Sequence, residues 1–204
     1  MCRVGVYVDG FNLYNGIHEA YGRTYLWLDV VALSHMMLAP GQELASVAYF
    51  TARVRRHREG RLRQVTYLEA LAAHRTDLRI VEGRFQQQSR ACRVCGIRWT
   101  THQEKETDVN IAVSLVEDAA FGRYDVALLI SGDSDLCPAI RAVQRVQPGV
   151  RVVSVFRPLR RSDPLARVAD GVYSIGRDKL RRAQLPVTIT TGAGIKLTRP
   201  PYWS

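Results

Sequence analysis

Short apolar runs alternate along the chain with longer stretches whose apolar residues recur every three or four positions. The short runs are typical of strands and the longer stretches of helices, and their alternation favours a parallel α/β sheet. The run 125–131 is apolar almost throughout, as expected for a strand covered on both faces. We expect strands at 3–9, 44–52, 78–85, 125–131, 150–156 and 172–175, and helices at 11–20, 30–38, 59–74, 107–121, 135–146, 163–169 and 177–183.

Within this scheme, two details concern single helices. Asp29 has the position of an N-cap for the helix at 30–38. The helix at 107–121 is predicted to bury the face that carries Val109, Ala112, Val113 and Val116.

Two segments depart from the alternation. Residues 86–103 are polar and irregular and contain two cysteines, whereas the chain after Leu185 is rich in Thr, Gly and Pro. We therefore expect one domain over residues 1–183, with a Cys-containing insertion at about 86–103. Residues 184–204 are expected to form a C-terminal arm or tail, with a small hairpin about Gly192. The arm packs either on its own domain or on a partner. In the second case the partner could be another copy of the chain, so a homo-oligomer is possible.

The composition indicates a globular, cytoplasmic protein. With 204 residues and 47% hydrophobic residues the chain can bury a core. No apolar run approaches the ~18 residues that span a bilayer, and the N-terminus enters a strand pattern without a separate apolar leader. Four cysteines in such a chain favour reduced thiols or a metal over a disulfide framework.

Positive charge dominates the chain. Lys and Arg number 29 against 19 acidic residues, for a net charge of +10, and only three of the 29 are lysines. Such a domain is attracted to a polyanion, and Arg is well shaped to contact phosphate. Six arginines cluster just after the second strand, where they could hold a nucleic-acid backbone: Arg53, Arg55, Arg56, Arg58, Arg61 and Arg63. The alternative is a solvated helix start that serves solubility. Near the first helix Tyr14, Tyr25 and Trp27 are candidates for base stacking or for core packing.

Acidic residues follow two of the most apolar strands. Asp9 ends the first strand, Asp133 and Asp135 follow the strand at 125–131, and Asp108 opens the helix before it. In an open α/β sheet, chemistry gathers at the carboxyl ends of the strands. Taken singly, each acid has an ordinary explanation as a turn residue, an N-cap or a partner of a helix dipole. Together they predict a site for a hard divalent cation, which removes the repulsion between the carboxylates.

Three motifs in this order resemble the NYN-domain family, part of the PIN-like nuclease superfamily. Residues 7–13 (YVDGFNL) resemble its V-D-G-x-N opening, residues 104–109 (EKETDV) its K-x-x-D-V motif, and residues 131–136 (SGDSDL) its S-G-D-S-D motif. The order and spacing hold over roughly residues 3–156. The resemblance implies a three-layer α/β/α fold with a central, mostly parallel sheet, and it makes the domain at 1–183 a NYN domain.

The resemblance also implies a ribonuclease site that uses Mg²⁺ or Mn²⁺. Asp9, Asp108, Asp133 and Asp135 would hold the metal, and Asn12 would fix the substrate or a water. Ser131 would be a lesser hydroxyl partner, and Lys105 either neutralises a phosphate or is a solvated lysine. In-line attack of water on the phosphodiester would leave 5′-phosphate and 3′-hydroxyl ends.

Two questions stay open at this level. Cys92 and Cys95 have the spacing of half a zinc site, and the alternative is a reduced surface turn. Besides the ribonuclease, the sequence allows a nucleic-acid-binding regulatory module with little catalysis, or a nuclease acting on DNA or structured substrates. The preference for RNA rests on the family resemblance alone.

Overall fold

The computed structural model describes residues 1–54, 58–92 and 95–203. Within these ranges a seven-stranded sheet has the order β4-β3-β2-β1-β5-β6-β7. Six of its strands, from β3 across to β7, run parallel, and only the edge strand β4 is antiparallel. The strands are β1 (Cys2–Asp9), β2 (Gln42–Ala52), β3 (Leu78–Ala91), β4 (Arg98–Lys105), β5 (Val126–Ile130), β6 (Arg151–Phe156) and β7 (Gly171–Ser174).

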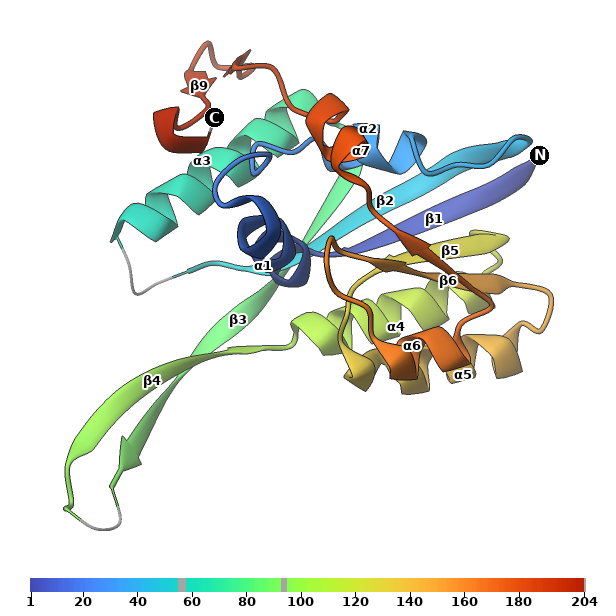
Figure 1. Ribbon diagram of the computed structural model, residues 1–204, viewed down its shortest axis with the longest axis horizontal. Coiled ribbons are helices and arrows are strands. Elements are labelled where there is room, and N and C mark those ends of the chain that lie inside the picture. Colours follow the sequence, from blue (N-terminus) through green and yellow to red (C-terminus); the bar gives the residue numbers. More distant parts are fainter. Residues whose placement is uncertain (55–57, 93–94, 204) are drawn as a thin grey trace.

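Helices cover both faces of this sheet, which makes the three layers that the family resemblance implied (Figure 1). One face carries α1 (Gly10–Tyr21), α2 (Val30–His35), α3 (Arg58–His74) and α7 (Arg177–Arg182). The other face carries α4 (Thr107–Ala120), α5 (Cys137–Val146) and α6 (Asp163–Val168). Among the described residues, no helix is both long and apolar enough to cross a membrane.

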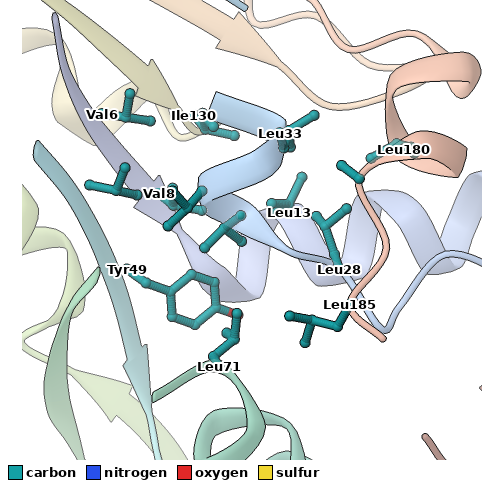
Figure 2. Close-up of a cluster of buried hydrophobic side chains, with 14 of the residues drawn as sticks. Val6, Val8, Leu13, Leu28, Leu33, Tyr49, Leu71, Ile130, Leu180 and Leu185 are labelled. Carbon is teal, nitrogen blue, oxygen red and sulfur yellow. The ribbon is translucent and has the colours of Figure 1, made fainter. Parts of the chain in front are cut away.

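The central strands β1 and β5 are buried on both sides, and the protein has one core cluster on each face of the sheet. Val6 and Val8 of β1 point to the first cluster, where they meet Leu13, Tyr49 and Leu71 (Figure 2). Tyr7, between them in β1, points to the opposite cluster under α4 and α5. Successive side chains of β1 thus point into opposite core clusters, as expected for a strand at the centre of the sheet.

The prediction of an irregular segment at 86–103 was wrong, because most of it forms a β-hairpin. The first half of β3 pairs with β2, and its second half continues as an antiparallel pair with β4, in register from Arg84 opposite Lys105 to Ala91 opposite Arg98. This arm extends away from the body of the protein (Figure 1). The two strands of the hairpin are held together by hydrogen bonds between their backbones. They therefore do not need the alternation of apolar and polar residues by which a strand is recognised in a sequence.

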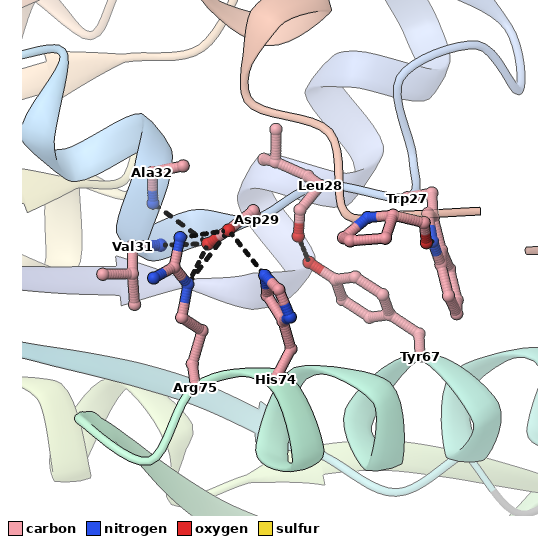
Figure 3. Close-up of polar contacts among 9 residues, drawn as sticks. Trp27, Leu28, Asp29, Val31, Ala32, Tyr67, His74 and Arg75 are labelled. Atoms are coloured by element: carbon pink, nitrogen blue, oxygen red, sulfur yellow. Dashed lines mark hydrogen bonds and ion pairs between the residues drawn. The ribbon is translucent and has the colours of Figure 1, made fainter. Parts of the chain in front are cut away.

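The chain after Ala183 packs on its own domain. Leu185, Ile189, Leu197 and Trp203 are buried in the same cluster as α3. The predicted hairpin is present as β8 (Thr188–Thr190) and β9 (Lys196–Thr198), and a short 3₁₀ turn, η2 (Pro201–Trp203), follows it. The indole of Trp27 is tied to this segment, since its Nε1 donates to the carbonyl of Pro186 at 2.8 Å (Figure 3).

Candidate functional site

The candidate site lies where the chain changes direction across the sheet. From β1 the chain goes to β2 and β3 on one side, and it later crosses to β5 on the other side. Asp9 pairs with Phe50 of β2, and Val8 pairs with Ile130 of β5, so the carboxyl ends of these three strands are level. Ligands of open α/β sheets bind in the crevice at such a switch point.

Asp9 is the buried carboxylate at this crevice. Its side chain is 6% exposed and caps α1, with Oδ1 accepting from the backbone N–H of Asn12 at 3.0 Å. The hydroxyl of Ser131, which follows β5, donates to Oδ2 at 2.9 Å. Gly10 must be a glycine, because a Cβ there would lie 2.6 Å from Cζ of Tyr49 and 2.7 Å from the carbonyl oxygen of Phe50.

Hydrogen bonds hold the loop after β5 against the start of α1. Gly132 N–H donates to Oδ1 of Asn12 at 3.1 Å, and Asp133 N–H donates to the Ser131 hydroxyl oxygen at 3.1 Å. Asp133 then caps the short turn η1 (Ser134–Leu136) by accepting from Asp135 N–H at 2.9 Å. Asp133 is half-buried and Asp135 exposed. Asn12 and Ser131 thus connect the two loops that carry the acids.

The acids are close enough to influence one another's ionisation. The pKa of Asp9 is raised to about 6, chiefly by burial; its two hydrogen bonds oppose the rise, and the charges of Asp108 and Asp133 add to it. Asp108 lies in the first turn of α4, and partial desolvation together with the charges of Asp133 and Asp135 raises its pKa. All four predicted acids therefore share one electrostatic field at this edge of the sheet.

This set of oxygen donors fits the chemistry of a hard cation. Carboxylate oxygens are preferred ligands of Mg²⁺ and Mn²⁺, and a cation would offset the repulsion between the acids, which adds to the effect of burial on the pKa values of Asp9 and Asp108. The acids are not arranged as a closed coordination shell, however. Within the described residues, no group of three or more His, Cys, Asp or Glu side chains is placed so that it could hold a metal ion.

The predicted arginine cluster has mixed outcomes. Arg53 is exposed but forms an ion pair with Glu82 of β3, with Nε and Nη2 2.7–2.9 Å from the carboxylate oxygens. Arg58 is exposed at the first residue of α3, on the same edge of the sheet as the acids. Arg55 and Arg56 lie outside the described residues.

Lys105 and the two cysteines lie along the hairpin. Lys105 is half-buried at the end of β4, three positions before Asp108. Cys92 is half-buried and Cys95 exposed, and Gly96 N–H donates to the carbonyl of Cys92 at 3.0 Å. Within the described residues no third metal-ligating side chain joins them.

Sequence reasoning missed an aromatic cavity at the first turn of α1. Gly10, Phe11 and Tyr14 line it from α1, and the other residues come from β2 and the segment just after it, from α3 and from the C-terminal turn. Of the three aromatics singled out from the sequence, Tyr14 lines this cavity, Trp27 is fully buried behind it, and Tyr25 packs on Tyr21. Trp203 could not be connected with it, because it is 194 positions away from Asp9 along the chain.

The parallel sheet, its helical layers and the acids at its switch point define a protein of the PIN-like α/β class. The family model for the NYN domain matches residues 3–176. The chain therefore belongs to the NYN domain family, as the three sequence motifs indicated.

Two individual proteins are similar to this chain. The 6-hydroxy-3-succinoylpyridine 3-monooxygenase of Pseudomonas putida is 28% identical over 183 residues, which cover 74% of this chain and 58% of that protein. The chain thus spans little more than half the length of this curated relative. A crystal structure of a Vibrio parahaemolyticus protein of unknown function matches with a TM-score of 0.58 and 21% identity, over 87% of this chain and 94% of that one. The second likeness concerns the fold alone.

Proposed function

We propose that this NYN domain is a metal-dependent endoribonuclease that hydrolyses RNA phosphodiester bonds and leaves 5′-phosphate and 3′-hydroxyl ends. The observation that carries the proposal is that four acids from three separate parts of the chain lie at one sheet edge, close enough that the charges of Asp133 and Asp135 act on Asp108 and that of Asp133 also acts on Asp9. The net charge of +10 supports a polyanionic substrate, because it leaves this acidic crevice within a basic protein. The activity in the name of the Pseudomonas relative is not extended to this chain, which spans only 58% of that protein.

Asp9, Asp108, Asp133 and Asp135 would hold Mg²⁺ or Mn²⁺. When bound, such an ion polarises the scissile phosphate and lowers the pKa of water. The protein's own part is to keep Asp9 oriented through the Ser131 hydroxyl and the Asn12 backbone N–H. Asn12 has its Oδ1 fixed by Gly132 N–H, so its amide presents Nδ2 as a donor for a substrate oxygen. Lys105 and the exposed Arg58 would balance phosphate charge on either side.

A cleavage assay tests this proposal. Labelled single-stranded RNA and DNA of the same sequence are incubated with the protein in EDTA, Mg²⁺ or Mn²⁺. Asp133→Asn is the informative variant, because Asn keeps the Oδ1 acceptor that caps η1 while removing the charge. Asp178→Asn, an exposed acid in α7, is the matched control. We expect metal-dependent RNA cleavage that falls by at least ~100-fold in Asp133→Asn and is unchanged in the control.

A second candidate is a nucleic-acid-binding module with little or no catalysis. It is favoured by the lack, within the described residues, of a closed group of three metal-ligating side chains. Binding of RNA without cleavage in either metal would establish this second candidate. Cleavage of DNA in preference to RNA would support the acidic site as a nuclease site but contradict the assignment of RNA as the substrate. Cleavage in EDTA, or full activity of Asp133→Asn, would overturn the metal assignment.

A further inference from the structure

A cavity of about 130 Å³ opens beside the first turn of α1, the helix that Asp9 caps. It lies between the first turn of α1, the end of β2, the first half of α3 and the C-terminal turn η2. Five aromatic side chains and one arginine are among the residues that line it: Phe11, Tyr14, Tyr49, Tyr67, Trp203 and Arg63. Since Gly10 and Phe11 follow Asp9 in the chain, the cavity and the acidic crevice share the start of α1.

The back wall of this cavity is held in place by contacts on several sides. Tyr67 is buried, and its hydroxyl donates to the carbonyl of Leu28 at 2.8 Å (Figure 3). Trp203 is 3% exposed, with its ring centroid 6.1 Å from that of Tyr67 and 6.3 Å from that of Trp27. A flat ligand would therefore meet a preformed surface and would not have to order these side chains.

Tyr14 lies at the mouth of the cavity. It is 36% exposed, and its ring lies 6.5 Å from that of Trp203 and stacks on His18. Truncating this ring removes less buried surface than truncating Tyr67 or Trp203, which are 9% and 3% exposed. Tyr14 is consequently the residue at which a ligand contact can be separated from a folding effect.

The size and charge of the cavity restrict its ligand. Sites for drug-sized molecules measure about 300–1,000 Å³, so 130 Å³ suits a single ring whose remaining atoms stay outside. Aromatic cages also attract organic cations, but here the guanidinium of Arg63 is part of the wall, and it stacks on Tyr202 at 5.7 Å. A neutral planar ring attached to an anionic chain fits both features.

We propose that this cavity receives one nucleobase of a single-stranded nucleic acid whose backbone passes the acids at Asp9. The inference deepens the proposed function, because it assumes a nucleic-acid ligand at the same sheet edge. The base stacks on Tyr14 and the rings behind it, while Arg63 lies near the adjoining phosphate. Stacking of a base on an aromatic side chain changes affinity by roughly 5–150-fold, so one position of the bound strand contributes more than its neighbours.

The test measures binding in EDTA, where metal-dependent cleavage cannot contribute. A short single-stranded RNA is compared with a series in which one base at a time is replaced by an abasic site. For wild type we expect one position at which loss of the base weakens binding by roughly 5–150-fold. Tyr14→Ala should bind the intact and abasic strands with equal affinity, and Tyr14→Phe should restore the difference. Phe121→Ala, an exposed aromatic at the end of α4, is the matched control and should behave as wild type.

The outcomes distinguish this inference from the proposed function. If all strands of the abasic series bind with equal affinity to a protein that still cleaves RNA, the base-binding role of the cavity is contradicted, while the proposed nuclease activity is supported. If loss of one base weakens binding only when Tyr14 is present, and the protein cleaves no nucleic acid, the base-binding role of the cavity is supported and the proposed nuclease activity is contradicted. A sensitive position that persists in Tyr14→Ala places the base elsewhere and overturns the assignment. Thermal melting of each variant checks that the fold is retained.

Discussion

The ionised carboxylate of Asp9 lowers the free energy of unfolding, and its hydrogen bonds to Asn12 and Ser131 offset this only in part. Its carboxyl is buried and lies near the charges of Asp108 and Asp133, and its pKa is raised to about 6. The pKa of an unfolded Asp is about 3.9. Between these values the folded protein binds more protons than the unfolded chain, so the free energy of unfolding falls as the pH rises from about 4 to 6.

Replacing Asp9 by Asn is expected to remove this pH dependence. A shift of about two pKa units corresponds to roughly 3 kcal/mol, so in EDTA above about pH 6 Asp9→Asn should be more stable than wild type by up to that amount. Urea unfolding across this pH range measures the effect, with the exposed Asp163→Asn as a control that should follow wild type. Equal pH slopes for Asp9→Asn and wild type would contradict the prediction.

The predictability of the site also differs from residue to residue. The convergence of Asp9, Asp133 and Asp135 followed from strand ends alone, because carboxyl ends of parallel strands meet at one edge. The contact between Asn12 and Gly132 could not be predicted in the same way. It depends on the exact register of β1 against β5, which the sequence pattern does not specify.

Among the elements, α2 and the end of α3 are joined by one buried acid, Asp29. The sequence predicted Asp29 as its N-cap, and Oδ1 accepts from the N–H groups of Val31 and Ala32 at 3.1 and 3.0 Å. The structure adds Arg75, beyond the end of α3, whose Nη2 lies 2.6 Å from Oδ2 (Figure 3). A single carboxylate therefore caps one helix and anchors the segment after another.

Asp29→Ala is expected to destabilise the protein by about 2–4 kcal/mol, since it removes the cap and leaves Arg75 without this partner. The urea midpoint measures the change. Asp178→Ala serves as the control: it breaks exposed pairs with Arg181 and Arg182, and it should leave the midpoint unchanged. A midpoint for Asp29→Ala equal to that of the control would show that the ion pair contributes little.

The positions of the strands and helices were easier to predict than the side of each helix that is buried. The strands and helices expected at 44–52, 59–74 and 163–169 agree with β2, α3 and α6 to within about two residues at each end. In α4, however, only half of the predicted face is buried: Ala112 and Val116 pack against the core. Val109 and Val113 are exposed, while Ile111 and Leu115 are fully buried. Two apolar stripes run along this helix, and only tertiary packing against the sheet decides which one is covered.

For the whole molecule, the distribution of arginine has a measurable consequence. Binding to a single strand weakens with salt, with a slope of roughly −0.7 per phosphate contacted. Replacing Arg58 and Arg61, both exposed in α3, by Gln should reduce the slope by about 1–1.4 if each contacts one phosphate. Arg151→Gln is the control, because this exposed arginine begins β6 at the opposite edge of the sheet.

The salt titration uses RNA in EDTA, so that binding is observed without cleavage. An unchanged slope in the α3 variant would show that the strand does not pass over this helix. An equal reduction in the Arg151 variant would indicate that net charge, and not position, governs binding.

The central position of β1 also sets a time scale for synthesis of the protein. Asp9 and its partner Ser131 are 122 positions apart, and at about 5–20 residues per second the ribosome needs roughly 6–25 s to make the intervening chain. During that interval β1 can pair with β2 but has no β5 beside it. One edge of an apolar strand is then unpaired, which is the condition in which strands associate with other chains. β1 is thus synthesised before the other strands of its sheet, yet it gains both neighbours only after β2 and β3 have gained theirs.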